Sequence, residues 1–167
     1  MATHALPHVF RIRPPFRQIL EVAADYCRLP VADGFSWGEA FAEVEDGEWY
    51  LVAFRSKHAT DADEARLTWL DEQASAAASR HPGFLYYFIG TPLPDGGCLS
   101  FCLWETAADA RAAADDPAHR LAMEEGLPAF AYYRLERFRL RKEGGVLAFH
   151  DLPSSFGARD GCPSRGG

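Results

Sequence analysis

Short runs rich in aromatic and β-branched residues alternate along the middle of the chain with longer runs rich in alanine. The short runs are typical of strands, and they cover residues 49–55, 84–90, 98–104 and 129–141. The alanine-rich runs place apolar residues at helical spacing. They cover residues 60–80 and 107–116, and the second pattern resumes after Pro117 and ends at Gly126. The predicted order of elements is therefore βαββαβ.

This order predicts an α+β fold of the ferredoxin-like kind, with an antiparallel four-stranded sheet and the helices on one face. The strands are apolar on both faces, because Leu99 and Phe101 point to one side of the sheet while Cys102 and Trp104 point to the other. An uncovered face would lose about 25 cal/mol for each Å² of apolar surface. We therefore expect a second copy to cover it, which gives a homodimer through the sheet face, a dimeric α/β barrel. The alternative cover is the N-terminal part of the same chain.

The chain divides into three parts around this unit. We expect residues 48–143 to form the dimeric α/β barrel domain. Residues 1–47 are predicted to be an N-terminal extension that packs on the core, with a helix over residues 16–28. Residues 144–167 are predicted to be a C-terminal tail that is partly disordered, because its end is rich in Gly, Pro and Ser.

Composition narrows the classes of function. The chain has 167 residues and is 48% hydrophobic, which excludes a disordered protein. Its 17 Lys and Arg against 24 Asp and Glu give a net charge of −7, which argues against general nucleic-acid binding. No apolar run has the length of a membrane span and no signal-peptide pattern is present, so we expect a cytoplasmic protein without a membrane partner. The cysteines have no zinc spacing and are expected to be reduced thiols, and neither a metal nor a cofactor is predicted.

Several short motifs, taken in order, resemble one family. They are Pro82-Gly83-Phe84 at the start of the second strand, Trp104-Glu105 at the end of the third, and Pro117 with His119 in the second helix. On these motifs, residues 49–141 resemble the antibiotic-biosynthesis-monooxygenase-like group of dimeric α/β barrel proteins. The resemblance implies a homodimer with a small-molecule pocket between the sheet and its helices. Some members of the group are cofactor-independent oxygenases that act on polycyclic phenols, and others bind and degrade haem.

The sequence departs from the haem-degrading members of this group. Those members carry a His near the middle of the second helix and an Asn on the first strand. Here the helix has Ala112, Ala113 and Ala114, and residues 49–55 contain no Asn. A haem-binding or haem-degrading function is therefore the weakest of the functional predictions.

His119 is the candidate catalytic residue. It follows Pro117 at a break in the second helix, where its side chain can turn toward the sheet. An imidazole with a pKa near neutrality can act as a general base on a phenol or an enolisable carbonyl. The structural alternative is a histidine at a helix bend whose ring nitrogen bonds a backbone carbonyl.

Aromatic residues provide the first candidates for substrate binding. Trp104 ends the third strand and can stack on an aromatic ligand, with burial in the core as the alternative. One tyrosine of each adjacent pair, Tyr86 with Tyr87 and Tyr132 with Tyr133, can reach the pocket and orient a ligand oxygen. Tyr86 and Tyr133 are the candidates, and packing in the core or in a dimer interface is the alternative for each.

Two arginines complete the candidate binding set. Arg55 ends an apolar strand and Arg134 lies inside an aromatic one, so a buried guanidinium at either position needs a carboxylate or an anionic ligand. Glu105 and Glu136 are the candidate partners for a purely structural ion pair. The other basic residues of the last strand fit a solvated strand face: Arg137, Arg139, Arg141 and Lys142.

Two functions of different classes remain open. The first is a small-molecule-binding enzyme that resembles the cofactor-independent monooxygenases and acts on phenolic or enolic substrates. In that mechanism His119 helps to deprotonate the substrate, the carbanion reacts directly with dioxygen, and Trp104 with a tyrosine holds the ring. The alternative is a non-catalytic dimeric ligand-binding or accessory protein, in which the same residues belong to the core.

Overall fold

A computed structural model describes residues 12–153. Its strands are β1 (Gly47–His58), β2 (Phe84–Phe88), β3 (Gly97–Trp104), β4 (Phe130–Glu143) and β5 (Val146–Leu152). Its helices are α1 (Trp37–Ala40), α2 (Glu64–Ser79), α3 (Ala107–Ala114) and α4 (Pro117–Gly126), with single 3-10 turns η1 (Tyr26–Arg28) and η2 (Leu127–Ala129). The order from β1 to β4 confirms the predicted βαββαβ unit and the α+β class.

The sheet has five strands rather than the four that the sequence predicts. The strand order is β2-β3-β1-β4-β5, and every neighbouring pair is antiparallel. The fifth strand forms because Gly144 and Gly145 take φ values of 58° and 80°, which allow the tight turn of a β-hairpin. The predicted C-terminal tail from residue 144 therefore begins with a strand that the sequence analysis did not predict. Its end, from residue 154, where disorder is expected, lies outside the described residues.

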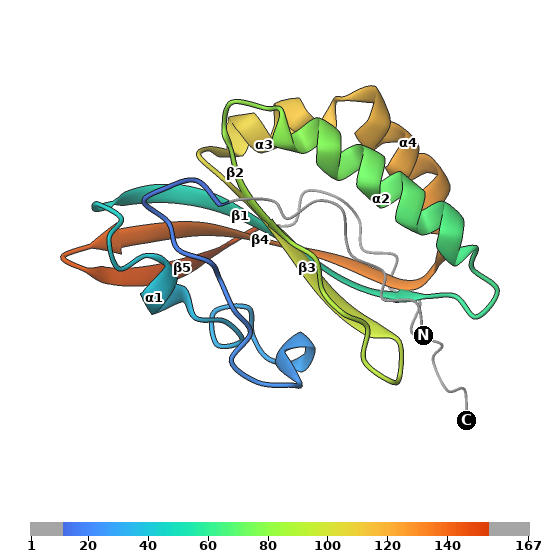
Figure 1. The fold of residues 1–167 in the computed structure, drawn as a ribbon, viewed down its shortest axis with the longest axis horizontal. Helices are drawn as coiled ribbons and strands as arrows, with labels where there is room; N and C mark the ends of the chain where they lie inside the picture. Colours follow the sequence, from blue (N-terminus) through green and yellow to red (C-terminus); the bar gives the residue numbers. More distant parts are fainter. Residues whose placement is uncertain (1–11, 154–167) are drawn as a thin grey trace.

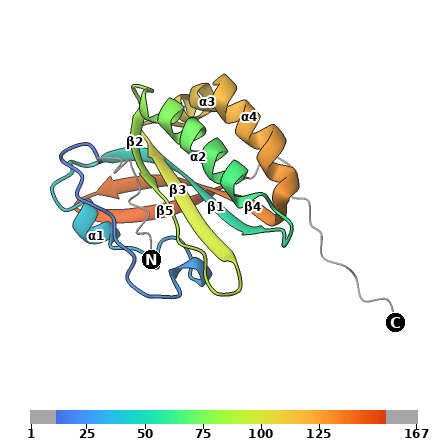
Figure 2. The same cartoon turned by 45° about the vertical axis from the view of Figure 1, so that its right-hand side comes forward.

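The structure has three layers, with the sheet as the middle one (Figure 1). Helices α2, α3 and α4 lie over one face, while the segment that precedes β1 lies against the other, and Figure 2 shows the same separation after rotation. We call residues 12–46 the N-terminal segment. We call the face that it covers the packed face, and the space between the opposite face and helices α2 to α4 the cleft.

Capping residues fix where the helices over the cleft begin. Asp63 accepts a hydrogen bond from the backbone N–H of Arg66 at 3.0 Å and starts α2, and Thr106 accepts one from Asp109 at 3.1 Å and starts α3. Asp116 caps α4 just before Pro117, whose ring suits a first helical turn. The break between α3 and α4 therefore comes from a new cap, and it starts the helix that carries His119.

The N-terminal segment does not contain the helix predicted over residues 16–28. Only Tyr26–Arg28 forms a single 3-10 turn, and the chain before it is extended. The backbone N–H of Ser36 donates to the carbonyl of Leu20 at 2.8 Å, and Glu21 pairs with Phe35 in an antiparallel bridge. This path buries Ile19 to 1% exposure against the sheet, while Leu20 stays 48% exposed.

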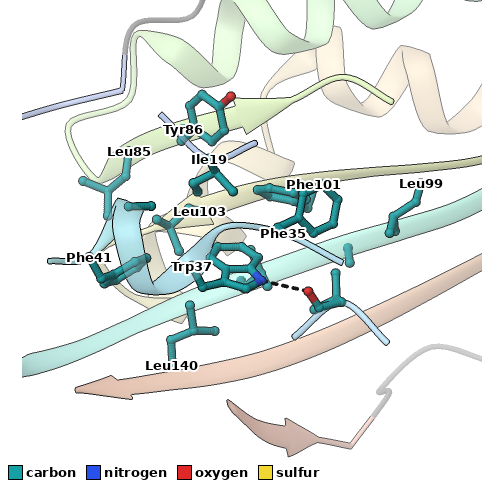
Figure 3. Packing of buried hydrophobic residues seen from close by; sticks show 14 of the residues in the cluster. Ile19, Phe35, Trp37, Phe41, Leu85, Tyr86, Leu99, Phe101, Leu103 and Leu140 are labelled. Carbon is teal, nitrogen blue, oxygen red and sulfur yellow. Dashed lines mark hydrogen bonds between the residues drawn. The ribbon is translucent and has the colours of Figure 1, made fainter. Parts of the chain in front are cut away.

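A closely packed aromatic core joins the N-terminal segment to the sheet (Figure 3). The ring of Phe101 on β3 lies 4.9 Å from that of Phe35 and 5.2 Å from that of Trp37, centroid to centroid. The indole N–H of Trp37 donates to the carbonyl of Val31 at 2.8 Å, so the buried indole is hydrogen-bonded. The sheet residues under the segment are fully buried: Leu51, Ala53, Leu99, Phe101, Leu103 and Leu140.

Lys142 fastens the N-terminal segment from the other end of β4. Its side chain is buried, and its ammonium group donates to the carbonyls of Phe41 at 2.7 Å and Val44 at 2.6 Å. The prediction that Lys142 belongs to a solvated strand face is therefore wrong. A buried ammonium group needs such acceptors, and the turn after α1 supplies them.

The N-terminal segment fills the role that we expected a second copy to fill. The packed face is buried within one chain, so the apolar face that motivated a homodimer through the sheet is not open. The alternative cover, the N-terminal part of the same chain, is the one that the structure has. Homodimerisation itself stays a prediction, and it would use another surface or displace the segment.

Candidate functional site

The cleft is the hollow side of the sheet. It has a volume of about 2270 Å³, which exceeds the roughly 300–1,000 Å³ of an ordinary ligand pocket. Its floor includes the side chains of β1, β3 and β4 that point away from the packed face, and its roof includes Leu67, Asp71 and Ala74 of α2. A ligand much smaller than this volume would be positioned by its polar contacts rather than by a close fit.

Trp104 lines the inner end of the cleft. Its indole N–H donates to the thiol sulfur of Cys102 at 2.9 Å, and its ring is in edge contact with Phe84 at 5.3 Å and with His81 at 5.9 Å. Only 3% of the residue is exposed. The indole therefore already packs against protein rings, and the role of Trp104 in ligand stacking stays a prediction.

His119 of α4 also lines the cleft, partly buried. Burial lowers the pKa of its imidazole from the ordinary value, while the charge of Asp116 acts weakly in the other direction. The neutral form therefore dominates at neutral pH, and a neutral ring nitrogen can accept a proton. Within residues 12–153 its ring nitrogens have no hydrogen-bond partner, so the structural alternative of a bond to a backbone carbonyl does not apply there.

The two predicted tyrosines lie on different faces of the sheet. Tyr133 of β4 lines the cleft, where burial raises the pKa of its phenol. Tyr86 lies on the packed face, 7% exposed, with its ring 6.1 Å from that of Phe101. The register of β2 shifts between Phe84 and Tyr86, which sets Tyr87 instead of Tyr86 beside the cleft residue Cys102.

The two predicted arginines lie at the rim of the cleft, and the guanidinium of Arg55 turns toward the N-terminal segment. Arg55 donates to Glu136 at 2.7 Å, to the carbonyl of Leu29 at 2.7 Å and to the carbonyl of Cys27. Arg134 stands opposite Arg55 on β4, and its more exposed guanidinium is 3.8 Å from the same Glu136 carboxylate. This is the structural ion pair given as the alternative, with Glu136 as the partner.

Asp71, a carboxylate that the sequence analysis did not single out, forms a partly buried polar contact in the cleft. The Tyr87 hydroxyl donates to Oδ1 of Asp71 at 2.7 Å, which joins β2 to α2 across the cleft. Burial raises the pKa of the Asp71 carboxyl, while the Tyr87 hydrogen bond lowers it and the charge of Glu72 raises it. Burial and the neighbouring Asp71 also raise the pKa of Tyr87 well above its ordinary value.

The sequence indicates that Asp71 is unusual, but it leaves open which tyrosine of the Tyr86 and Tyr87 pair is its partner. Asp71 follows Leu67 by four residues and precedes Ala74 by three, so a carboxylate interrupts the apolar stripe of the helix. Which of Tyr86 and Tyr87 faces it depends on the register shift in β2, which no local pattern shows.

The cleft also contains positively charged side chains. Arg137 of β4 and Arg111 of α3 both lower the pKa of Tyr50, against the larger effect of burial that raises it. Arg137 therefore belongs to the cleft rather than to the solvated strand face that we predicted for it. The cleft thus combines aromatic walls, a carboxylate and guanidinium groups.

Two further features concern metal binding and membrane spans. Among residues 12–153, no three His, Cys, Asp or Glu side chains gather in a group that could hold a metal ion. None of the helices in the described part of the chain is both long enough and apolar enough to cross a membrane.

Comparison with known proteins places this architecture among its relatives. A family model described as PB2B2.08-like matches residues 12–151, from the N-terminal segment to β5. No curated protein matches the chain. Among solved structures, Rv0793 from Mycobacterium tuberculosis is similar, with a TM-score of 0.50 and 13% identity over 59% of this chain and 99% of that one.

Two other solved structures are similar to more than half of the chain. A dimeric ferredoxin-like protein of unknown function from Thermobifida fusca has a TM-score of 0.47 and 17% identity, over 55% of this chain and 91% of that one. SnoaB, a cofactor-independent oxygenase from Streptomyces nogalater, has a TM-score of 0.46 and 18% identity, over 60% of this chain and 98% of that one. The predicted fold is thus confirmed by the similarity to Rv0793, and that likeness concerns the fold alone.

Proposed function

The chain belongs to the PB2B2.08-like family, and we propose that its cleft binds a small aromatic molecule with a phenolic or enolic hydroxyl and oxidises it with dioxygen. The observation that carries the proposal is the contrast between a closely packed face and a hollow one on the same sheet. Aromatic rings and ionisable groups together line the hollow side: Tyr50, Tyr87, Tyr133, Trp104, Asp71, His119 and Arg137. A pocket that is apolar with a few convergent polar groups is the usual form of a small-molecule site.

His119 is the proposed base in this reaction. Its neutral imidazole accepts a proton from the substrate, and the carbanion that remains reacts directly with dioxygen. For an anthrone, the CH2 group becomes C=O. One atom of dioxygen forms the new carbonyl, and the other leaves as water with the two hydrogens of the CH2 group. The carbon loses four electrons and dioxygen gains them, so dioxygen is the oxidant of the whole reaction.

The alternative is a non-catalytic ligand-binding or accessory protein. The observation that favours it is Trp104, whose indole is already bonded to Cys102 and packed against Phe84 and His81. In that case the cleft binds an aromatic molecule and releases it chemically unchanged.

Oxygen uptake with anthrone as the probe separates these functions. The proposed enzyme accelerates uptake above the rate without protein, the His119→Ala variant loses most of the acceleration, and the His150→Ala variant keeps it because His150 is exposed on β5. Binding of anthrone without acceleration supports the non-catalytic alternative. The absence of both binding and acceleration would contradict the proposal as a whole.

A further inference from the structure

The Asp71–Tyr87 pair carries a second inference, which rests on the proposed function. We propose that Asp71, held in place by Tyr87, is the specificity-determining residue that binds the hydroxyl group of the aromatic ligand. The cleft would then select molecules that present an O–H donor over the matching ethers. The hydrogen bond joins α2 to β2 and both side chains line the cleft, so the pair borders the space that a ligand between helix and sheet would occupy.

Only one oxygen of Asp71 is hydrogen-bonded within the described part of the chain. Its Oδ1 accepts the hydrogen bond from Tyr87 at 2.7 Å, and its Oδ2 has no hydrogen-bond partner among the described residues. A carboxylate can accept about four hydrogen bonds, and a partly buried one with a single neutral donor is costly to keep charged. A ligand that donates a hydrogen bond to Oδ2 would remove part of that cost.

The direction of the hydrogen bond between Tyr87 and Asp71 is fixed. Burial keeps the Tyr87 phenol protonated, because the charged form of a phenol is disfavoured away from water. Tyr87 therefore remains the donor to Asp71, and Asp71 remains the acceptor. The group that approaches Oδ2 must bring its own hydrogen.

The neighbours of the pair favour a hydroxyl over an ammonium group as this donor. The charges of Asp71 and Arg137 both affect the pKa of Tyr133. A guanidinium group therefore lies in the same part of the cleft as the carboxylate. Arg137 repels a cationic ligand that lies beside Tyr133, while a neutral hydroxyl meets no such penalty. The buried thiol of Cys102 and the phenol of Tyr133 complete the surroundings, and burial keeps both of them neutral.

The arrangement also allows a proton to move without changing the net charge of the site. A proton that passes from the ligand O–H to Asp71 Oδ2 leaves a neutral carboxyl group and a ligand oxyanion. The O–H bond of the ligand breaks, a new O–H bond forms on Asp71, and the total charge stays at −1. The carboxyl is suited to this exchange because burial has already moved its pKa upward from the ordinary value.

The experiment measures the binding of two fluorescent probes, 2-naphthol and 2-methoxynaphthalene, which differ by one methyl group on the oxygen. The wild-type chain is expected to bind the naphthol about tenfold more tightly than the ether. Asp71→Ala and Asp71→Asn are expected to reduce that preference to less than about threefold, with the affinity for the ether unchanged. Tyr87→Phe is expected to give an intermediate preference, because Asp71 loses the hydroxyl that holds it.

The Asp61→Asn variant is the matched control, because Asp61 is an exposed carboxylate just before α2 and does not line the cleft. It should keep the full preference, and unchanged binding of the ether shows that each variant is folded. Equal affinity of the wild type for naphthol and ether, or an Asp71→Ala variant that keeps the preference, overturns the inference and leaves the proposed function standing. Tighter binding of 2-(aminomethyl)naphthalene, a cation, than of 2-naphthol also overturns it. If the wild type binds neither naphthalene probe, the proposed function falls together with the inference.

Discussion

The two faces of the sheet have opposite characters although they are built from alternate residues of the same strands. On the packed face, Phe101 is fully buried among the rings of the N-terminal segment, and Arg55 and Lys142 donate to its carbonyls. On the cleft face, the next residue along β3, Cys102, lies beside an open volume. One face is closed by complementary packing, and the other keeps space and partly satisfied polar groups.

This difference shows how a single chain can separate stability from function. Closely packed faces lose several kcal/mol when a side chain is removed, whereas a cleft must leave volume unfilled and tolerate groups that are costly to bury. The N-terminal segment closes the packed face without help from a partner. The cleft is then free to carry the carboxylate, the imidazole and the phenols that a reaction or a binding site requires.

The largest expected effect compares the same substitution on the two faces. Phe101→Ala should cost about 3–5 kcal/mol of the free energy of unfolding, because it removes a ring packed on all sides. Phe54→Ala on β1, whose ring lines the cleft, should cost less than about half as much. Urea unfolding of both variants measures the difference, and equal losses would show that the cleft is as closely packed as the other face.

The next effect tests how the N-terminal segment is fastened. Lys142→Met should cost about 2–4 kcal/mol, because the carbonyls of Phe41 and Val44 lose their buried donor. Lys57→Met is the matched control, since Lys57 is exposed on β1, and it should change the free energy of unfolding by less than about 0.5 kcal/mol. A loss of similar size in both variants would contradict the structural role of Lys142.

A smaller effect concerns the stability cost of Asp71 and its dependence on pH. Because burial raises the pKa of this carboxyl in the folded state, the native chain binds more protons than the unfolded chain between the ordinary value of 3.8 and the raised one. The contribution of Asp71 is therefore most favourable below 3.8 and becomes unfavourable as pH rises through the folded-state pKa. Asp71→Asn should stabilise the protein relative to the wild type at high pH, and this advantage should shrink in acid.

Urea unfolding of wild type and Asp71→Asn at pH values of about 8 and about 4 measures that difference. The Asp61→Asn variant shows the behaviour of an exposed carboxylate. An advantage of Asp71→Asn that is the same at both pH values, or that grows in acid, would mean that burial does not penalise the charged form of Asp71.

The smallest expected effect belongs to His119. Its folded-state pKa lies below the ordinary value of 6.5, so the unfolded chain binds more protons in that interval and stability falls as pH drops through it. His119→Gln should remove this part of the acid sensitivity, while His150→Gln on exposed β5 should not. An unchanged pH profile in His119→Gln would place the imidazole in contact with water.

The elements predicted with most success are those whose signals are local. Alternation in β1 and β3 and the helical spacing of apolar residues in α2 and α3 depend on neighbouring residues, so the βαββαβ order followed from the sequence. Residues 16–28 have a helix-like composition, but the structure pairs Leu20 to Val22 with residues 34–36 and buries Ile19 against the sheet. Such a tertiary preference cannot be seen in a short window of sequence.

The site was only partly visible in the sequence for a similar reason. Trp104, His119 and Tyr133 line the cleft as the pattern suggested, although their roles stay predictions. Tyr86 was assigned to the wrong face because one irregularity in β2 reverses which tyrosine points toward the helices. Arg55 found its partners in the backbone of the N-terminal segment, which no spacing rule connects to β1.

The central claim is that ligands bind in the cleft while the packed face is purely structural. Hydrogen exchange of the full chain, with and without 2-naphthol, tests it most directly because each region can be read separately. The account predicts slower exchange in α2 and α4 when the probe is bound, with residues 16–44 unchanged. Slower exchange confined to residues 16–44, with α2 and α4 unaffected, would contradict it.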